Sequence, residues 1–127
     1  MEKIDVKQIY SDLKDKKISV NEFKEILVGV ADIKDFAQKF FNLVSEDIKG
    51  DQKNLESIIT SLNQVLENND INQEIKSKVI DALIDIAKRI QAKQWKPEQI
   101  LKGLGMLLLT ILAIILGIDK IKDLDKK

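Results

Sequence analysis

Hydrophobic residues recur every three or four positions along most of the chain, which is the spacing of amphipathic α-helices. The pattern predicts helices over about residues 5–16, 20–49, 52–67 and 70–94. The helix over 20–49 is expected to be the longest, because one continuous apolar stripe runs through it: Phe23, Ile26, Leu27, Val30, Ile33, Ala37, Phe40, Phe41, Val44 and Ile48. No alternation long enough for a sheet is present, so the predicted fold is all-α, a small bundle of about four helices followed by a strongly apolar C-terminal helix.

Residues with capping chemistry mark the expected ends of these helices. Ser19 and Glu22 have the spacing of a capping box, in which each side chain accepts a hydrogen bond from the other residue's backbone N–H. Residues 70–73 are interpreted as a second capping box. Gly50 fits a left-handed helix stop, with Asp51 as the next cap. Pro97 is placed for the first turn of the last helix, where its missing N–H has no consequence.

The last helix, expected over about residues 100–118, departs from the amphipathic pattern. From Leu104 to Ile118 every residue is apolar or Gly except Thr110, which gives fifteen residues without a charge. A helix that is apolar on all sides is buried in a large protein core or in lipid. Since the preceding helices are few and the chain is small, they are expected to surround four turns of Leu and Ile poorly. The sequence therefore predicts a membrane-inserted helix, with burial in an oligomer or by the head as the alternative.

The length and flanks of this segment suit a single membrane crossing. Fifteen residues cover about 22 Å, and including residues 100–103 gives about 28 Å, close to the roughly 30 Å of a hydrocarbon core. This requires Lys102 to extend its amine to the headgroups. Trp95 and Lys96 match the ring-and-cation pattern of a membrane interface. The predicted anchor residues are Trp95, Lys96, Lys102, Leu104, Leu107, Leu108, Ile111, Leu112, Ile115 and Ile118.

Charge is balanced overall but not locally, with 21 Lys and Arg against 21 Asp and Glu. Residues 1–87 carry 12 Lys against 17 acidic residues, whereas residues 88–102 carry five cations against Glu98. A basic collar beside an apolar helix suits anionic lipid headgroups; ordinary surface charge at a helix end is the alternative interpretation. An acidic head does not suit duplex nucleic acid, so no nucleic-acid partner is expected.

The chain contains no His and no Cys. It therefore lacks the usual general base near neutral pH, the thiol nucleophile and the commonest metal ligands. Catalysis would have to rest on carboxylates, Lys, Ser, Thr or Tyr10 alone, so an enzyme is not expected, and no cofactor, metal or small-molecule substrate is inferred. The aromatic cluster of Phe36, Phe40 and Phe41 is interpreted as core.

Two short patterns resemble known modules. Asp70, Asn72 and Glu74 have the spacing of a calcium loop, but Ile75 occupies the position that requires Gly, so a helix cap is the preferred interpretation. Residues 13–23 resemble the short helical SHOCT module of bacterial proteins, with Lys in the turn where that module usually has Gly. No function is inferred from either pattern.

Three functions from different classes fit these features. The first is a non-enzymatic interaction protein that is tail-anchored in a membrane: residues 1–96 form a cytoplasmic amphipathic head, and residues 97–127 form a single-pass apolar helix with a charged tail. The N-terminus has no apolar stretch typical of a cleavable signal. The second is a membrane-perturbing oligomer of the holin or toxin kind. The third is a soluble helical oligomer or virion component with the apolar helix at a subunit interface. The expected partners are membrane lipid and a protein or second copy bound through helices.

Overall fold

Six helices and no strand make up residues 5–47, 52–92 and 96–117, the part of the chain that our computed structural model describes. The predicted all-α fold is confirmed. The apolar C-terminal helix is also present. In chain order the helices are α1 (Val6–Lys14), α2 (Val20–Val28), α3 (Ile33–Asp47), α4 (Gln52–Asn68), α5 (Gln73–Gln91) and α6 (Pro97–Leu116).

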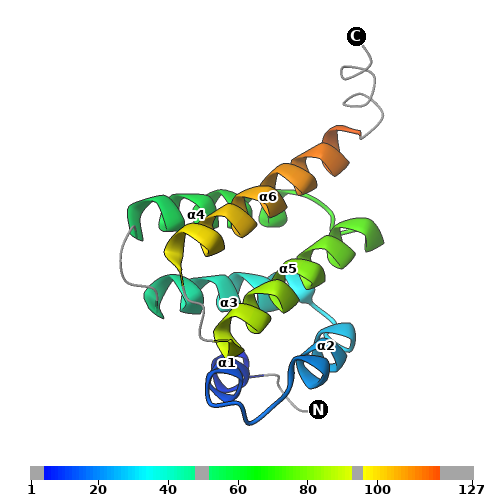
Figure 1. Cartoon of the computed structure of the whole chain (residues 1–127). Coiled ribbons are helices and arrows are strands. Elements are labelled where there is room, and N and C mark those ends of the chain that lie inside the picture. The colour runs from blue at the N-terminus through cyan, green and yellow to red at the C-terminus, as the bar shows by residue number, and fades with distance from the viewer. Residues whose placement is uncertain (1–4, 48–51, 93–95, 118–127) are drawn as a thin grey trace.

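The four longer helices form two hairpins. In Figure 1, α3 and α4 run side by side, and α5 and α6 run diagonally to them as a second pair. The two hairpins are joined by packing of α6 against α4 and of α5 against α3. The short helices α1 and α2 lie at the opposite end from α6, where α1 packs against α3 and α5, and α2 packs against α5.

The aromatic side chains gather in the core where α1, α2 and α3 meet. Phe23 stacks on Phe40 with ring centroids 5.6 Å apart, and Tyr10 meets Phe40 edge-on at 5.4 Å. Phe36 and Phe41 are buried beside them. Such ring pairs contribute about 0.5–1.5 kcal/mol beyond the area that they bury. The expectation that the phenylalanines form core is confirmed.

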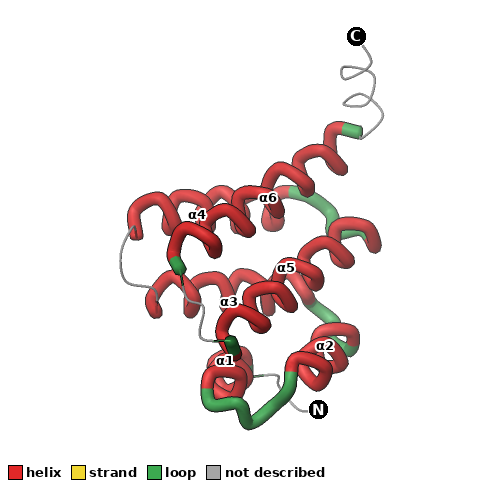
Figure 2. The backbone as a smooth tube through the Cα atoms, viewed as in Figure 1, coloured by secondary structure: helices red, strands yellow, loops and turns green. Residues whose placement is uncertain are grey.

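The predicted single helix over residues 20–49 is wrong, because the chain breaks between α2 and α3 (Figure 2). Gly29 ends α2, and its N–H donates to the carbonyls of Glu25 and Ile26. Asp32 then accepts a hydrogen bond from the N–H of Asp35 at 3.1 Å, which satisfies an otherwise unpaired donor at the start of α3. Hydrophobic spacing continues across the break, since Val30 and Ile33 are both buried. The apolar stripe therefore concealed the end of one helix and the start of the next.

One capping prediction is confirmed and the other is displaced. Ser19 Oγ accepts from the N–H of Glu22 at 3.0 Å, and Glu22 Oε1 accepts from the N–H of Ser19 at 3.1 Å, which completes the capping box. At α5 the capping residue is Asn72, whose Oδ1 accepts from the N–H of Ile75 at 2.8 Å. The predicted box over residues 70–73 is therefore wrong by two positions. Pro97 is the first residue of α6, as expected.

The turn between α1 and α2 is held by the far end of α5. The side-chain amide of Gln91 donates to the carbonyl oxygens of Leu13 at 3.3 Å and Ile18 at 2.6 Å. Lys16, in the middle of this turn, has a φ of 59°, a left-handed conformation that favours glycine.

Several sequence predictions concern residues outside the described part of the chain: Ile48, Gly50, Asp51, Trp95 and Ile118.

Candidate membrane and partner interface on the last helix

The inner face of α6 completes the core of the bundle. Ile100, Leu104, Leu107 and Ile111 are buried where α6 packs against α4 and α5. Their spacing of four, three and four residues places them on one side of a helix. Burying one such side chain stabilises the fold by about 1.5–3 kcal/mol. In this structure α6 is therefore integral to the packing of the head.

The outer face of α6 is also apolar. Met106, Leu109 and Leu116 lie on the opposite side, in one row with Ala113 and Lys102. The exposed fractions of the three larger side chains are 57%, 63% and 65%. We call Met106, Leu109, Ala113 and Leu116 the outer stripe. Contiguous apolar surface of this kind marks a contact with protein or membrane more often than ordinary protein surface.

The C-terminal turns of α6 extend beyond the other helices. Figure 1 shows the orange end of α6 projecting past α4 and α5 toward the C-terminus. Ile115, whose helical position is close to the inner face, is accordingly exposed. Gly117, with a φ of 96°, follows the helix as its C-cap. At this end the helix thus lacks cover even on its inner side.

The polar residue within the apolar segment is satisfied by its own helix. The Thr110 hydroxyl donates to the backbone carbonyl of Met106 at 2.8 Å. This back-bond satisfies the hydroxyl donor without water or a partner side chain. Thr110 is therefore compatible with an apolar environment around α6.

One segment within the described residues has the length and composition of a membrane span, Glu98–Leu116, with 19 residues. At 1.5 Å per residue it is about 28 Å long. Core helices of soluble proteins meet the same criterion, but most of their residues are buried. In this segment Ile100, Leu104, Leu107 and Ile111 are the buried side chains.

The structure divides the predicted anchor residues between two environments. Leu104, Leu107 and Ile111 face the core. The others within the described residues are half-buried or exposed: Leu108 and Leu112 are half-buried, and Lys96, Lys102 and Ile115 are exposed.

The sequence prediction did not identify the three most exposed apolar residues of α6, which are Met106, Leu109 and Leu116. A segment that is apolar on all sides gives no indication of which face is buried. Lys102 could have indicated the exposed face of α6, because a charged residue marks the solvent side of a helix. Met106 and Leu109 follow Lys102 at helical spacing and therefore lie on the same side.

The basic collar is weaker than its sequence indicated. Arg89 lies 3.1 Å from the carboxylate of Asp85, four residues earlier, and it donates to Gln99 Oε1 at 2.7 Å. Lys88, Lys96 and Lys102 are exposed. The lysines therefore supply the accessible positive charge near the start of α6.

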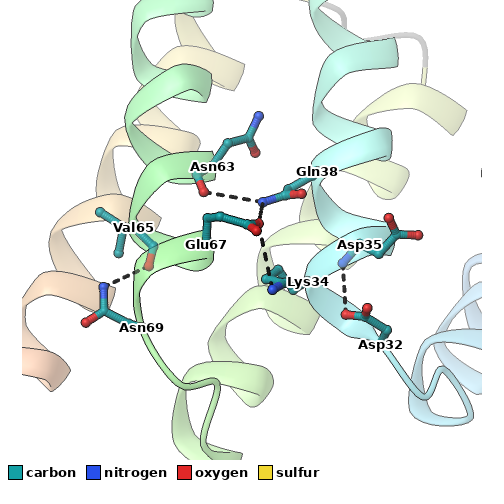
Figure 3. Close-up of polar contacts among 8 residues, drawn as sticks. All are labelled: Asp32, Lys34, Asp35, Gln38, Asn63, Val65, Glu67 and Asn69. Carbon is teal, nitrogen blue, oxygen red and sulfur yellow. Dashed lines mark hydrogen bonds and ion pairs between the residues drawn. The ribbon is translucent and has the colours of Figure 1, made fainter.

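A polar cluster lies between α3 and α4 (Figure 3). Gln38 donates its side-chain amide to the carbonyl of Asn63 at 3.3 Å and to Glu67 at 3.2 Å, and Lys34 lies 3.7 Å from Glu67. These contacts tie the two helices of the first hairpin together.

A second polar cluster joins α1 to the end of α3. The Tyr10 hydroxyl donates to Asp47 Oδ2 at 2.9 Å, and Lys14 Nζ lies 2.6 Å from the same oxygen. Burial of the ring, together with the hydrogen bond to Asp47, raises the pKa of Tyr10 well above its ordinary value of 10.0. Tyr10 therefore stays protonated to a higher pH than an ordinary tyrosine.

A hollow of about 470 Å³ lies beside α1 and α3. It is lined by Asp5, Val6, Lys7, Lys39, Asn42, Leu43 and Glu46. No three Asp or Glu side chains within residues 5–47, 52–92 and 96–117 lie close enough together to hold a metal ion. We therefore take the exposed apolar surface of α6 as the candidate functional site.

No family model, curated protein or solved structure matches this chain.

Proposed function

We propose that this protein is a non-enzymatic helical interaction module that attaches to a membrane through α6. The observation that carries the proposal is the outer stripe, in which Met106, Leu109 and Leu116 are exposed on a helix whose opposite face is in the core. Lipid would cover these side chains without any change in the polar surface of the head. Each Leu transferred from water to an apolar surrounding contributes about 1.5–3 kcal/mol.

The position of positive charge supports lipid as the surrounding medium. Lys96 and Lys102 are exposed at the start of α6, and Lys102 is in line with the outer stripe. Near a membrane surface each such cation contributes about 1 kcal/mol of attraction to anionic lipid. The proposed topology places the acidic head, residues 1–96, in the cytoplasm, with α6 as the single membrane-attached helix.

Flotation of the full chain with vesicles of zwitterionic and anionic phospholipid tests this function. The chain is expected to rise with the vesicles, and Met106→Ser/Leu109→Ser is expected to lower the bound fraction several-fold. Val28→Ser is the matched control, because Val28 is as exposed as Leu109, at 63%, but lies on α2. An intact chain that remains in the dense fraction with both lipid types would refute membrane attachment.

A second candidate function is a soluble oligomer joined through the same face. Gly105 lies beside the outer stripe, and a Cβ placed on it would have no neighbour within 4 Å, so another helix could approach closely there. Sedimentation analysis without detergent separates the two candidates. A discrete soluble oligomer that dissociates in Met106→Ser/Leu109→Ser, with no vesicle binding, favours the oligomer.

Membrane perturbation remains a hypothesis that requires several copies, since one helix cannot line a pore. Dye release from the vesicles used for flotation tests it directly. Attachment without release at saturating protein would support anchoring rather than permeabilisation.

A further inference from the structure

Helix α6 is held in the bundle along its inner face. Four aliphatic side chains are buried where α6 packs against α4 and α5: Ile100, Leu104, Leu107 and Ile111. The Arg89 side chain adds a hydrogen bond to Gln99 Oε1 at 2.7 Å, which joins α5 to the first turns of α6. Lipid on this face would have to displace α4 and α5 and would leave their facing side chains in water. The inner face is therefore closed to a bilayer while the bundle is assembled.

The outer stripe by itself is too short to cross a bilayer. From Met106 to Leu116 it extends about 15 Å along the helix axis, against roughly 30 Å for a hydrocarbon core. A helix that lies parallel to the surface buries its apolar face only about 5–10 Å deep, at the boundary between headgroups and acyl chains. The exposed apolar surface of α6 therefore suits a helix that lies along one leaflet.

Charged residues bound the apolar segment at both ends. Glu98 and Lys102 are exposed and precede the outer stripe on α6, and Asp119 and Lys120 follow the helix in the sequence. A crossing by Glu98–Leu116 would place Lys102 below the headgroups and the inner face in lipid. A helix parallel to the surface lets both ends of the segment stay near the headgroups of one leaflet.

We propose that α6 binds in the plane of one leaflet, with the outer stripe among the acyl chains, Lys102 at the headgroups and the inner face still packed on α4 and α5. This inference rests on the proposed membrane attachment and adds how the helix is bound. The protein lies on the bilayer as an intact bundle, and α6 does not cross the membrane.

The α5 side of α6 is compatible with this arrangement. A Cβ placed on Gly103 would lie 3.8 Å from Asp85 Oδ2, so this carboxylate is beside α6. Arg89 Nε pairs with the same oxygen at 3.1 Å, which offsets the negative charge. Lys88, one position before Arg89, is exposed. The carboxylate therefore adds little repulsion toward anionic headgroups.

Depth in the bilayer distinguishes a helix in the plane from one that crosses. The chain contains no Cys, so Met106→Cys, Leu109→Cys and Leu116→Cys each supply a single thiol for an environment-sensitive fluorophore. Quenching is measured in anionic vesicles whose lipids carry a spin label either near the headgroup or near the end of the acyl chain. Val28→Cys is the matched control, because Val28 is as exposed as Leu109 but lies on α2.

The expected result is that the shallow spin label quenches all three stripe positions at least twofold more than the deep label does, and that Val28→Cys stays near the background. In a crossing helix Leu109 would lie near the bilayer centre. Strongest quenching of Leu109→Cys by the deep label would therefore overturn the inference.

A cross-link tests whether the bundle stays assembled on the membrane. Asp85→Cys/Gly103→Cys introduces two neighbouring thiols, which a short bifunctional reagent can join across α5 and α6. Circular dichroism establishes that the variant is folded before and after cross-linking. The cross-linked chain is expected to float with anionic vesicles within twofold of the unlinked variant, because α6 does not leave α5. A several-fold loss of flotation on cross-linking would overturn the inference.

Either contrary result leaves membrane attachment standing, because the unlinked chain still floats. A chain that does not float with anionic or zwitterionic vesicles overturns both proposals.

Discussion

Leu104 and Leu109 lie five positions apart on α6 in opposite environments: Leu104 is fully buried, and the exposed fraction of Leu109 is 63%. Five residues turn a helix by about 140°, which is enough to place the two side chains on opposite faces. The inner face of α6 stabilises the bundle, and the outer face is available for contact with lipid or with another protein. The same residue type thus has two roles within one and a half turns.

This difference predicts unequal effects of the same substitution. Leu104→Ala is expected to lower the free energy of unfolding by about 2–5 kcal/mol, because it removes buried methyl groups and leaves a cavity. Leu109→Ala is expected to change it by less than about 0.5 kcal/mol. Urea unfolding of both variants in buffer without lipid provides the measurement. Equal losses in the two variants would contradict the observed orientation of α6.

The break between α2 and α3 predicts that the stability of the protein depends on the Asp32 side chain. Asp32→Ala is expected to lower the free energy of unfolding by about 1 kcal/mol, since the N–H of Asp35 loses its acceptor. Asp32→Asn should retain most of the stability, because an Asn side chain also caps helices well. Chemical denaturation of the two variants checks the prediction, and an Asp32→Ala chain as stable as the wild type would argue for one uninterrupted helix.

The raised pKa of Tyr10 predicts how the free energy of unfolding changes at alkaline pH. Its pKa is raised in the folded state, so the unfolded chain releases the phenolic proton first as the pH rises above 10.0. The stabilisation is fully present below that pH and then declines by up to about 1.4 kcal/mol per pH unit. Tyr10→Phe should show a shallower decline between pH 10 and 11.5. Denaturation curves with parallel pH dependence for both proteins would contradict this assignment.

The turn at Lys16 predicts a stabilising substitution. Lys16 has a φ of 59°, a conformation that is unfavourable by roughly 1–2 kcal/mol for a residue with a Cβ. Lys16→Gly removes this strain but adds freedom to the unfolded chain, so a net gain of about 0.5–1 kcal/mol is expected. Thermal unfolding measures the gain. Lys17→Gly is the control, and it should not stabilise the protein, since Lys17 is not in the left-handed region.

Local signals predicted the helices well where chemistry and spacing agreed. Ser19 and Glu22 form the predicted box, and Pro97 begins α6, because caps depend on residues within one turn of each other. Prediction failed at Gly29, since burial of Val30 and Ile33 keeps the apolar spacing regular through a real break. Asn72 was missed as a cap because Asp70, two residues earlier, has equally suitable chemistry.

The candidate site was predictable in its location but not in its orientation. The apolar residues of α6 identify the segment from composition alone, and Thr110 bonds to its own helix as its side chain allows. The half-buried Leu108 and the exposed Ile115 are as apolar as the buried Leu107, so hydrophobicity could not rank them. Their different exposure depends on how the other helices pack around α6.

The sequence alone therefore determined that this chain is helical, where most of its helices begin, and that the last helix is strongly apolar. These properties depend on backbone hydrogen bonds and side chains that are near in the chain. The tertiary structure decided that Leu104 lies inside and Leu109 outside, because α6 carries no charged residue from Leu104 onward that would mark its outer side. Packing against α4 and α5, whose positions depend on contacts distant in sequence, supplies that choice.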